Sequence, residues 1–264
     1  MEFNSYRTMR FARRGRILHA DFNRPDVLNA VDHSTHQDLA RLFSDITADR
    51  DTDVVILSGT GRAFSAGGDL DYIQGMIDAP DQFLDDMPDV KRIIFSMLDC
   101  PKPLIAKLNG HAIGLGATIA LFCDVVFAAP EVKIADPHVR LGFTAGDGGA
   151  VIWPHLIGHA RAKEFLMTGR AITAVEAERI GLINHVVPAD ELDKAVNDFA
   201  DELCRGPTRA IQWTKLSVNI GLKQLAHAVM DASVAYEALS NHTEDHREAV
   251  RAAREKRPPI FKGN

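Results

Sequence analysis

Residues 135–150 read ADPHVRLGFTAGDGGA and contain the two side chains best suited to moving a proton, His138 and Asp147. An imidazole has an unperturbed pKa of ~6.5 and titrates near neutral pH. A carboxylate among apolar neighbours such as Phe143 and Trp153 has a raised pKa and is a better base. The pattern indicates acid–base chemistry. Two structural alternatives stay open: a hydrogen-bonded histidine lining a pocket, and an aspartate that caps the next helix.

Two glycine-rich segments follow strand-like runs: AFSAGGDL at residues 63–70 and NGHAIGLGAT at residues 109–118. Small side chains let a ligand approach the backbone closely. A helix beginning near Gly116 would point free N–H groups at that ligand, an arrangement that suits an anion or a developing oxyanion. A dinucleotide site is not indicated, because Ile119 occupies the place of the third glycine in GxGxxG. Close helix packing is the alternative role of these glycines.

Metal and redox chemistry have weak support in the sequence. His155 and His159 are four residues apart, but no glutamate lies between them, so we predict no metal site. The three cysteines, Cys100, Cys123 and Cys204, form no CxxC pair and indicate reduced, packed thiols in a reducing compartment.

The elements that must position these residues alternate between strand and helix patterns. Strands are predicted over residues 16–22, 54–57, 103–106, 124–129 and 182–187 from apolar runs or alternation. Capping boxes predict helices that begin after Ser34 and after Thr173, the second closed by Gly181, and Thr243 caps a last helix. From residue 189 the pattern is helical only. These features predict an α/β core over residues 1–198 and a helical region over residues 199–264.

Composition and charge exclude several classes of function. The chain of 264 residues is 46% hydrophobic and 25% charged, ordinary values for a globular protein. Its net charge of −6 argues against binding to nucleic acid or to an anionic membrane. No secretory signal is indicated, and polar residues interrupt the most apolar run, residues 103–129. We therefore expect a cytoplasmic protein with neither nucleic acid nor membrane as a partner.

A series of short motifs runs in fixed order along nearly the whole chain. They are NRP (residues 23–25), LNA (28–30), FSAGGDL (64–70), PLIA (103–106), NG (109–110), GLG (114–116), CD (123–124), TG (168–169), GLI (181–183) and FKG (261–263). On these motifs the chain resembles the enoyl-CoA hydratase/isomerase (crotonase) superfamily.

The resemblance implies an α/β, crotonase-like (ClpP/crotonase) spiral of ββα units with a C-terminal helical region that builds a homotrimer or a dimer of trimers. It implies an acyl-CoA thioester as the substrate, so that coenzyme A arrives as part of the substrate and no separate cofactor is needed. Two backbone N–H groups would hold the thioester carbonyl as it becomes an enolate. By motif match these donors are Ala66 and Leu115.

The resemblance also suggests residues that contact the substrate. They are Arg24, Leu28, Ala30, Gly68, Asp69, Leu70, Gly114, Gly116, Thr118, Leu141, Gly146 and Lys262. Arg24, Lys256, Arg257 and Lys262 would meet the CoA phosphates, with ordinary solvated charges as the alternative. Residues 71–90 would form a variable lid-like loop or loose helix that lines the acyl pocket.

The sequence departs from the family at the two glutamates with which its hydratases activate water. Thr118 and His138 stand in those two positions. A threonine hydroxyl cannot accept a proton near neutral pH. We therefore expect the base to be Asp147, because some branches of the superfamily carry an active aspartate in this region, and His138 to be the second polar group.

Three functions remain open at this point. The first is an enzyme of the hydratase/isomerase type that shifts a double bond or adds water through an enolate. The second is a hydrolase or decarboxylase on the same scaffold. The third is a catalytically silent oligomer that binds acyl-CoA.

Overall fold

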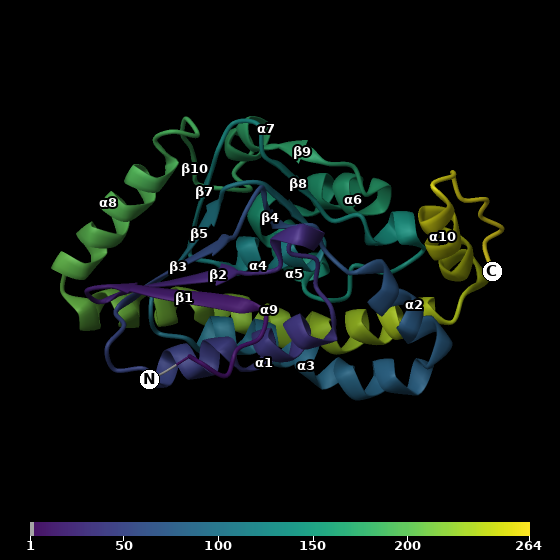
Figure 1. The fold of residues 1–264 in the computed structure, drawn as a ribbon, viewed down its shortest axis with the longest axis horizontal. Coiled ribbons are helices and arrows are strands. Elements are labelled where there is room, and N and C mark those ends of the chain that lie inside the picture. The colour runs from purple at the N-terminus through teal and green to yellow at the C-terminus, as the bar shows by residue number, and fades with distance from the viewer. Residues whose placement is uncertain (1–2) are drawn as a thin grey trace.

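The strands form two sheets in the computed structural model, which describes residues 3–264 (Figure 1). The larger sheet has the order β1 (Met9–Arg14), β2 (Ile17–Phe22), β3 (Val54–Gly59), β5 (Leu104–Leu108), β7 (Val125–Ala128), β10 (His185–Val186). The smaller sheet has the order β4 (Ala63–Ser65), β6 (His111–Ile113), β8 (Lys133–Ala135), β9 (Ile172–Thr173). Only the pairs β1–β2 and β8–β9 are antiparallel among these strands.

The chain alternates between the two sheets as it advances. β3, β5 and β7 each add a strand to the larger sheet, and the strand that follows each of them, β4, β6 or β8, joins the smaller one before helical segments begin. Inner parallel strands are buried on both faces, so they read as apolar runs. β3 is buried along its whole length. The predicted repetition of ββα units is confirmed.

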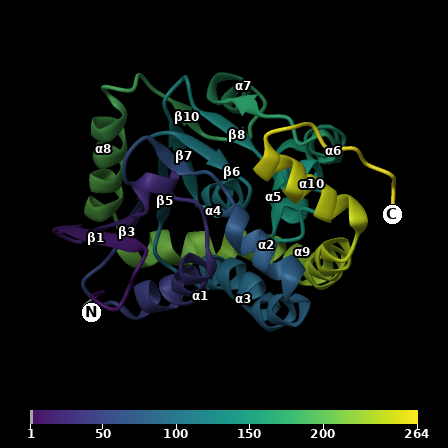
Figure 2. The ribbon, with the colours of Figure 1, turned by 45° about the vertical axis from the view of Figure 1, so that its right-hand side comes forward.

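Helices surround the sheets (Figure 1). The α-helices are α1 (His33–Ala48), α2 (Leu70–Asp78), α3 (Pro80–Asp99), α4 (Leu115–Phe122), α5 (Gly149–Ile157), α6 (His159–Thr168), α7 (Ala174–Arg179), α8 (Leu192–Arg205), α9 (Thr208–Asn241) and α10 (Glu244–Glu255). Two 3-10 turns, η1 (Pro25–Val27) and η2 (His138–Leu141), join them. Long α9 runs beside α3, and α10 lies near α2 and η2 (Figure 2).

Helix caps follow the sequence signals in two of three cases. Thr173 caps α7 and Thr243 caps α10, as predicted, and Gly181 has the positive φ of 82° expected of a glycine just after a helix. The prediction that Ser34 caps the first helix is wrong. Asp32 is the cap, because its carboxylate accepts the N–H of Thr35 at 2.8 Å.

The segment predicted as one strand over residues 16–22 is the second strand of a hairpin, since β1 pairs with β2 around a turn at Gly15. Residues 71–90, predicted as a lid-like loop or loose helix, form α2 and the first half of α3. Pro80 suits the first turn of α3, where a proline costs no intrahelical hydrogen bond.

One hydrophobic core extends from the sheets into the C-terminal helices. Val196 of α8 and Ala226, Met230 and Val234 of α9 belong to the same buried cluster as the strands. Position 198 lies inside α8, so the expected division at 198/199 falls within a helix.

The three cysteines are free, with Cys100 and Cys123 buried. None of the described helices is both long and apolar enough to span a bilayer.

We predict that Gly116→Ala destabilises the protein by ~1–3 kcal/mol, the usual cost of overpacking a core. A Cβ on Gly116, in the first turn of α4, would lie 2.5 Å from the Cβ of Ser65 at the end of β4. Urea unfolding of the variant and of the parent measures the change in the free energy of unfolding. The matched control is Gly221→Ala in α9, where no atom lies within 4 Å and alanine should stabilise the helix. Equal stability of Gly116→Ala and the parent would contradict this packing.

Candidate active site

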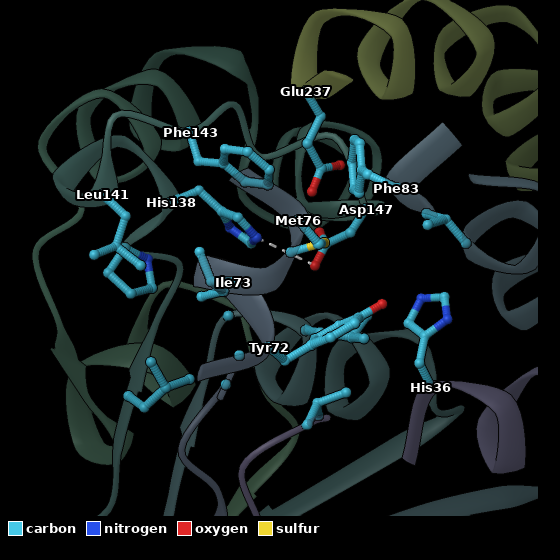
Figure 3. A pocket seen from close by; sticks show the side chains of 18 of the residues that line it. His36, Tyr72, Ile73, Met76, Phe83, His138, Leu141, Phe143, Asp147 and Glu237 are labelled. Carbon is cyan, nitrogen blue, oxygen red and sulfur yellow. Dashed lines mark ion pairs between the residues drawn. The ribbon is translucent and has the colours of Figure 1, made fainter. Parts of the chain in front are cut away.

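A cavity of about 140 Å³ lies where the ends of β4 and β6 meet η2, α2, α3, α9 and α10 (Figure 3). Its volume is close to that of engineered cavities that hold a benzene ring, about 150 Å³. Most of the wall is apolar. It is lined by Val31, His36, Ala66, Gly67, Gly68, Tyr72, Ile73, Met76, Phe83, Asp86, Val90, Ile113, Gly114, Leu115, Pro137, His138, Leu141, Phe143, Asp147, Glu237 and His246.

The two glycine-rich segments touch at one side of this cavity. Gly67 and Gly114 both have positive φ, 83° and 55°, a region that favours glycine. A Cβ on Gly67 would lie 3.0 Å from the carbonyl oxygen of Ile113, so only glycine fits this approach. Gly68 follows Gly67 and Leu115 follows Gly114 in the chain. The contact therefore places Gly68 near Leu115, and both residues line the cavity.

The amide of Ala66 is not free to hold a substrate oxygen. Its N–H donates to the carbonyl of Leu28 at 3.0 Å, so the prediction of Ala66 as an oxyanion donor is wrong. The bridge between Val31 and Gly68 is made by the flanking groups, Val31 N–H to Gly67 and Asp69 N–H to Val31. That pattern turns the N–H of Gly68 away from Val31. Across residues 3–264 neither Gly68 nor Leu115 uses its amide in a hydrogen bond.

His138 lies beside this pair of amides. A Cβ on Gly114 would lie 3.8 Å from Cε1 of the imidazole. Nδ1 is hydrogen-bonded to Asp136, and Nε2 lies 3.5 Å from Oδ2 of Asp147. Burial alone would lower the pKa of His138, but the charges of Asp136 and Asp147 outweigh burial and raise the pKa well above 6.5.

The two carboxyl oxygens of Asp147 have different surroundings. Oδ1 accepts the hydroxyl of Thr118 at 3.2 Å and the N–H of Gly149 at 3.3 Å. Oδ2 faces His138 and has no hydrogen-bond partner in the part of the chain that the structure describes. Burial raises the pKa of Asp147, and the charge of His138 offsets part of that rise. Asp147 precedes the cap of α5, Gly148, and its contact with the N–H of Gly149 helps to order the start of the helix.

Sequence reasoning missed two polar residues that the C-terminal helices bring to this cavity. Glu237 of α9 is 6% exposed, and its Oε2 has no partner among the described residues. Burial, reinforced by the charge of Asp147, raises the pKa of Glu237 well above 4.5. A signal was present in the sequence: Glu237 lies on the same helical stripe as the buried Met230, Val234 and Asn241.

His246 of α10 is the second missed residue. Its Nδ1 bonds to the carbonyl of Leu141 at 2.6 Å, and its ring stacks on Phe143 with 4.4 Å between centroids. Nε2 is buried without a partner in the described chain. Burial lowers the pKa of His246, so the ring is neutral near pH 7. His246 therefore anchors Leu141 and Phe143, which form part of the cavity wall.

The structure brings some of the predicted site residues to the cavity and leaves others outside it. Ala66, Gly68, Gly114, Leu115, His138, Leu141 and Asp147 line it. The predicted residues outside this described lining are Arg24, Leu28, Ala30, Asp69, Leu70, Gly116, Thr118, Gly146 and Lys262. Thr118 acts through Asp147, while Gly116 and Gly146 allow close packing against Ser65 and α9.

Two of the four basic residues expected at CoA phosphates, Arg24 and Arg257, form ion pairs within the described chain. Arg24 lies 3.0 Å from Asp32 and donates to the carbonyl of Ala30. Asp69 caps α2 by accepting the N–H groups of residues 71 and 72. Arg257 pairs with Glu248. The predicted phosphate contacts stay predictions.

Asp136, His138 and Asp147 also form a group whose potential ligand atoms lie within 4.8 Å of one another. We predicted no metal site from the sequence. The grouping coincides with the contacts of the His138 imidazole, which lies between the carboxyl groups of Asp136 and Asp147.

The comparisons with known proteins agree on one family. The model of the family described as enoyl-CoA hydratase/isomerase matches residues 13–264. An enoyl-CoA isomerase/hydratase of Mycosarcoma maydis is 33% identical over 257 residues, covering 94% of this chain and 93% of that protein.

Solved structures show the same relationship. An enoyl-CoA hydratase/isomerase from Mycobacterium paratuberculosis aligns with a TM-score of 0.89 and 35% identity, over 92% of this chain and 97% of that one. A monofunctional enoyl-CoA isomerase from M. smegmatis aligns with a TM-score of 0.70 and 32% identity, over 82% and 94%. The crotonase-like fold expected from the sequence motifs is confirmed.

We predict that Glu237→Gln stabilises the protein increasingly as the pH rises above 4.5. Because the folded protein raises the pKa of Glu237, it binds a proton more tightly than the unfolded chain, so the parent loses stability between pH 4.5 and the raised pKa. Glutamine has no proton to lose. Thermal unfolding at a series of pH values tests the trend, with Glu202→Gln on the exposed part of α8 as the control. A pH-independent difference from the parent would contradict the raised pKa.

Proposed function

The chain belongs to the enoyl-CoA hydratase/isomerase family, and on this basis we propose that it is an enzyme that stabilises the enolate of an acyl-CoA thioester and shifts a carbon–carbon double bond with Asp147 as the base. The observation that carries the proposal is the arrangement of Asp147 Oδ2. It is a buried carboxyl oxygen that faces His138 and accepts no hydrogen bond from the described residues, in a cavity lined also by Gly68 and Leu115, whose amides form no hydrogen bond within residues 3–264.

The thioester carbonyl would accept hydrogen bonds from the amides of Gly68 and Leu115. Leu115 is the first residue of α4, so the positive end of the helix dipole adds to its N–H. Amides fixed before the reaction stabilise charge without having to reorient, and loss of one such donor costs ~10²–10³ in rate in comparable enzymes.

The proton transfer follows from the position of the base. Asp147 Oδ2 takes a proton from carbon, and the electron pair of that C–H bond moves into the conjugated system, placing negative charge on the thioester oxygen. Return of the same proton to the other end of the system completes the shift of the double bond. Asp147 has a raised pKa, which suits a group that must both accept and release a proton.

His138 would tune this base and not replace it. Its Nδ1 is bound to Asp136, which fixes the ring, while Nε2 faces Asp147. A protonated His138 favours the ionised form of Asp147. Glu237, which lies above Asp147 in Figure 3, is a second carboxyl group that can hold a proton inside the cavity.

Isomerisation is favoured over hydration by the surroundings of Thr118. The hydroxyl that stands in the place of a hydratase glutamate is fully buried and donates to Asp147. It therefore contributes no base for a water molecule in the cavity.

A second candidate, hydrolysis of a thioester or a C–C bond, is favoured by one observation. A histidine oriented by a buried carboxylate, as Asp136 orients His138, is the arrangement of a general base for water. Release of free thiol from CoA, followed with a thiol reagent, separates hydrolysis of the thioester from isomerisation.

We further propose that the protein is a homotrimer or a dimer of trimers. Trp213, Val218, Ile220, Tyr236 and Leu239 of α9 are each more than half exposed. Large apolar side chains exposed along α9 support burial of this helix against another subunit.

We predict that Asp147→Asn lowers kcat for conversion of 3-enoyl-CoA to 2-enoyl-CoA by ~10²–10⁴, the usual contribution of a general base. Asparagine retains the size of the side chain and can still accept the Gly149 N–H, but it cannot take the proton. Absorbance of the conjugated thioester measures turnover, and deuterium exchange at carbon measures the proton step. The exposed Asp190→Asn is the matched control. Full activity of Asp147→Asn would return this residue to a structural role.

We predict that His138→Gln moves the acid limb of the kcat/KM profile to higher pH. The positive charge of His138 lowers the pKa of Asp147, so its removal raises that pKa, and a higher pH is then needed to ionise the base. The measurement is kcat/KM against pH for the parent and the variant. A limb that stays in place or moves to lower pH would show that His138 does not tune the base.

A further inference from the structure

The cavity has a second polar side that the proposed reaction does not use. His36 of α1, Tyr72 of α2 and Asp86 of α3 line it. Figure 3 shows His36 on the opposite side of the cavity from His138, with the hydroxyl of Tyr72 pointing toward it. Apolar side chains of α2 and α3, among them Ile73, Met76 and Phe83, also line the cavity.

One of the two carboxyl oxygens of Asp86 has partners within the protein. Its Oδ2 accepts the hydroxyl of Tyr72 at 2.9 Å and lies 3.2 Å from Nδ1 of His33. Oδ1 forms no hydrogen bond within residues 3–264, although Asp86 is only 9% exposed. One carboxyl oxygen at this side of the cavity is therefore fixed in place and open to a donor.

His36 is the less expected member of this group. Only 6% of the residue is exposed, and no hydrogen bond to either ring nitrogen is found in the described chain. The nitrogens are not among the fully buried polar atoms, and the residue lines the cavity, so they are open to a partner that a ligand supplies. Unlike Asp147, His36 is not part of the network around His138.

The charges around this side restrict what the ligand group can be. Burial lowers the pKa of His36 even though Asp86 and Asp89 oppose that effect, so the imidazole is neutral and can both donate and accept. Burial and the hydrogen bond to Asp86 raise the pKa of Tyr72 above its usual value, and the negative charges of Asp86, Asp32 and Asp89 add to that rise. A carboxylate on the ligand would meet this negative field, whereas a neutral hydroxyl would not.

We propose that His36 and Asp86 form a subsite for a hydroxyl group carried by the acyl chain of the substrate, away from the thioester. The hydroxyl would donate to Asp86 Oδ1 and accept from the N–H of His36, while Ile73, Met76 and Phe83 contact the methylene groups of the chain. The inference rests on the proposed function, since it assumes an acyl-CoA in this cavity. It narrows the substrate class to hydroxylated acyl-CoA thioesters.

Binding of saturated thioesters to the full-length protein tests the subsite without any need for turnover. Titration calorimetry compares hexanoyl-CoA, 6-hydroxyhexanoyl-CoA and adipoyl-CoA, together with the four- and eight-carbon members of each series. We expect one hydroxylated compound to bind about fivefold or more tightly than its unsubstituted partner, the gain from about one hydrogen bond. The dicarboxylic compound should bind most weakly.

Two variants test whether His36 and Asp86 cause the tighter binding of the hydroxylated compound. His36→Leu should reduce the ratio of the two dissociation constants to about one, and Asp86→Asn should improve binding of adipoyl-CoA relative to hexanoyl-CoA by removing the negative charge. Asp86→Asn keeps the shape of the side chain, so the test stands even if His36→Leu fails to fold. His155→Leu, at an exposed position on α5, is the matched control.

The outcomes separate this inference from the proposed function. Equal affinity for the plain and hydroxylated compounds at every length, or tightest binding of the dicarboxylic one, would overturn the subsite and leave the acyl-CoA enzyme standing. Binding of none of the thioesters would overturn the proposed function and the subsite with it. A hydroxyl preference that survives in both His36→Leu and Asp86→Asn would also overturn the subsite.

Discussion

The burial of several ionisable groups around one imidazole is the constraint on which the site depends. Asp136 and Asp147 contact His138 from two sides, and Glu237 lies close enough to affect its pKa. Charges in a protein interior are tolerated only when they are paired or neutralised by a proton. The positive charge of His138 balances part of the negative charge, and burial raises the pKa of Asp147 and of Glu237, which favours their protonated forms. The same balance that makes this group tolerable also leaves it able to accept and return a proton.

The surrounding fold supplies the close approaches that this group needs. Gly148 lies against Thr118 and Phe122, and Gly146 lies against Ser233 and Glu237, so α4, α5 and α9 come together without side chains between them. On the opposite side, Gly67 and Gly114 bring the two loops with free amides into contact. The groups proposed for acid–base chemistry and for holding the thioester oxygen are thus placed by glycines in segments that are far apart in the sequence.

The departure from the two-glutamate pattern of the family has a structural counterpart. Thr118 turns its hydroxyl to Asp147 and away from the cavity, and the position after Pro137 holds an imidazole with a carboxylate on each side. The acid–base groups therefore come from the loop before α5 and from α9. Since α9 ends next to α2 and α10, the C-terminal helices close the cavity and also supply Glu237 and His246 to it.

The sequence by itself determined the family fold, much of the strand and helix pattern and two helix caps, and it pointed to His138 and Asp147, which line the same cavity. These features depend on neighbours in the chain: a threonine and the N–H three residues on, a run of β-branched residues, or a motif of small residues. The tertiary structure decided which amide of 63–70 is free, because that depends on Leu28 accepting the N–H of Ala66. The cap of α1 is Asp32 and not Ser34, although the contact that decides it, with the N–H of Thr35 three residues on, is local. Only folding brought His36, Glu237 and His246 to one cavity with His138, because contacts between residues so far apart in the sequence are made by packing and leave no local pattern.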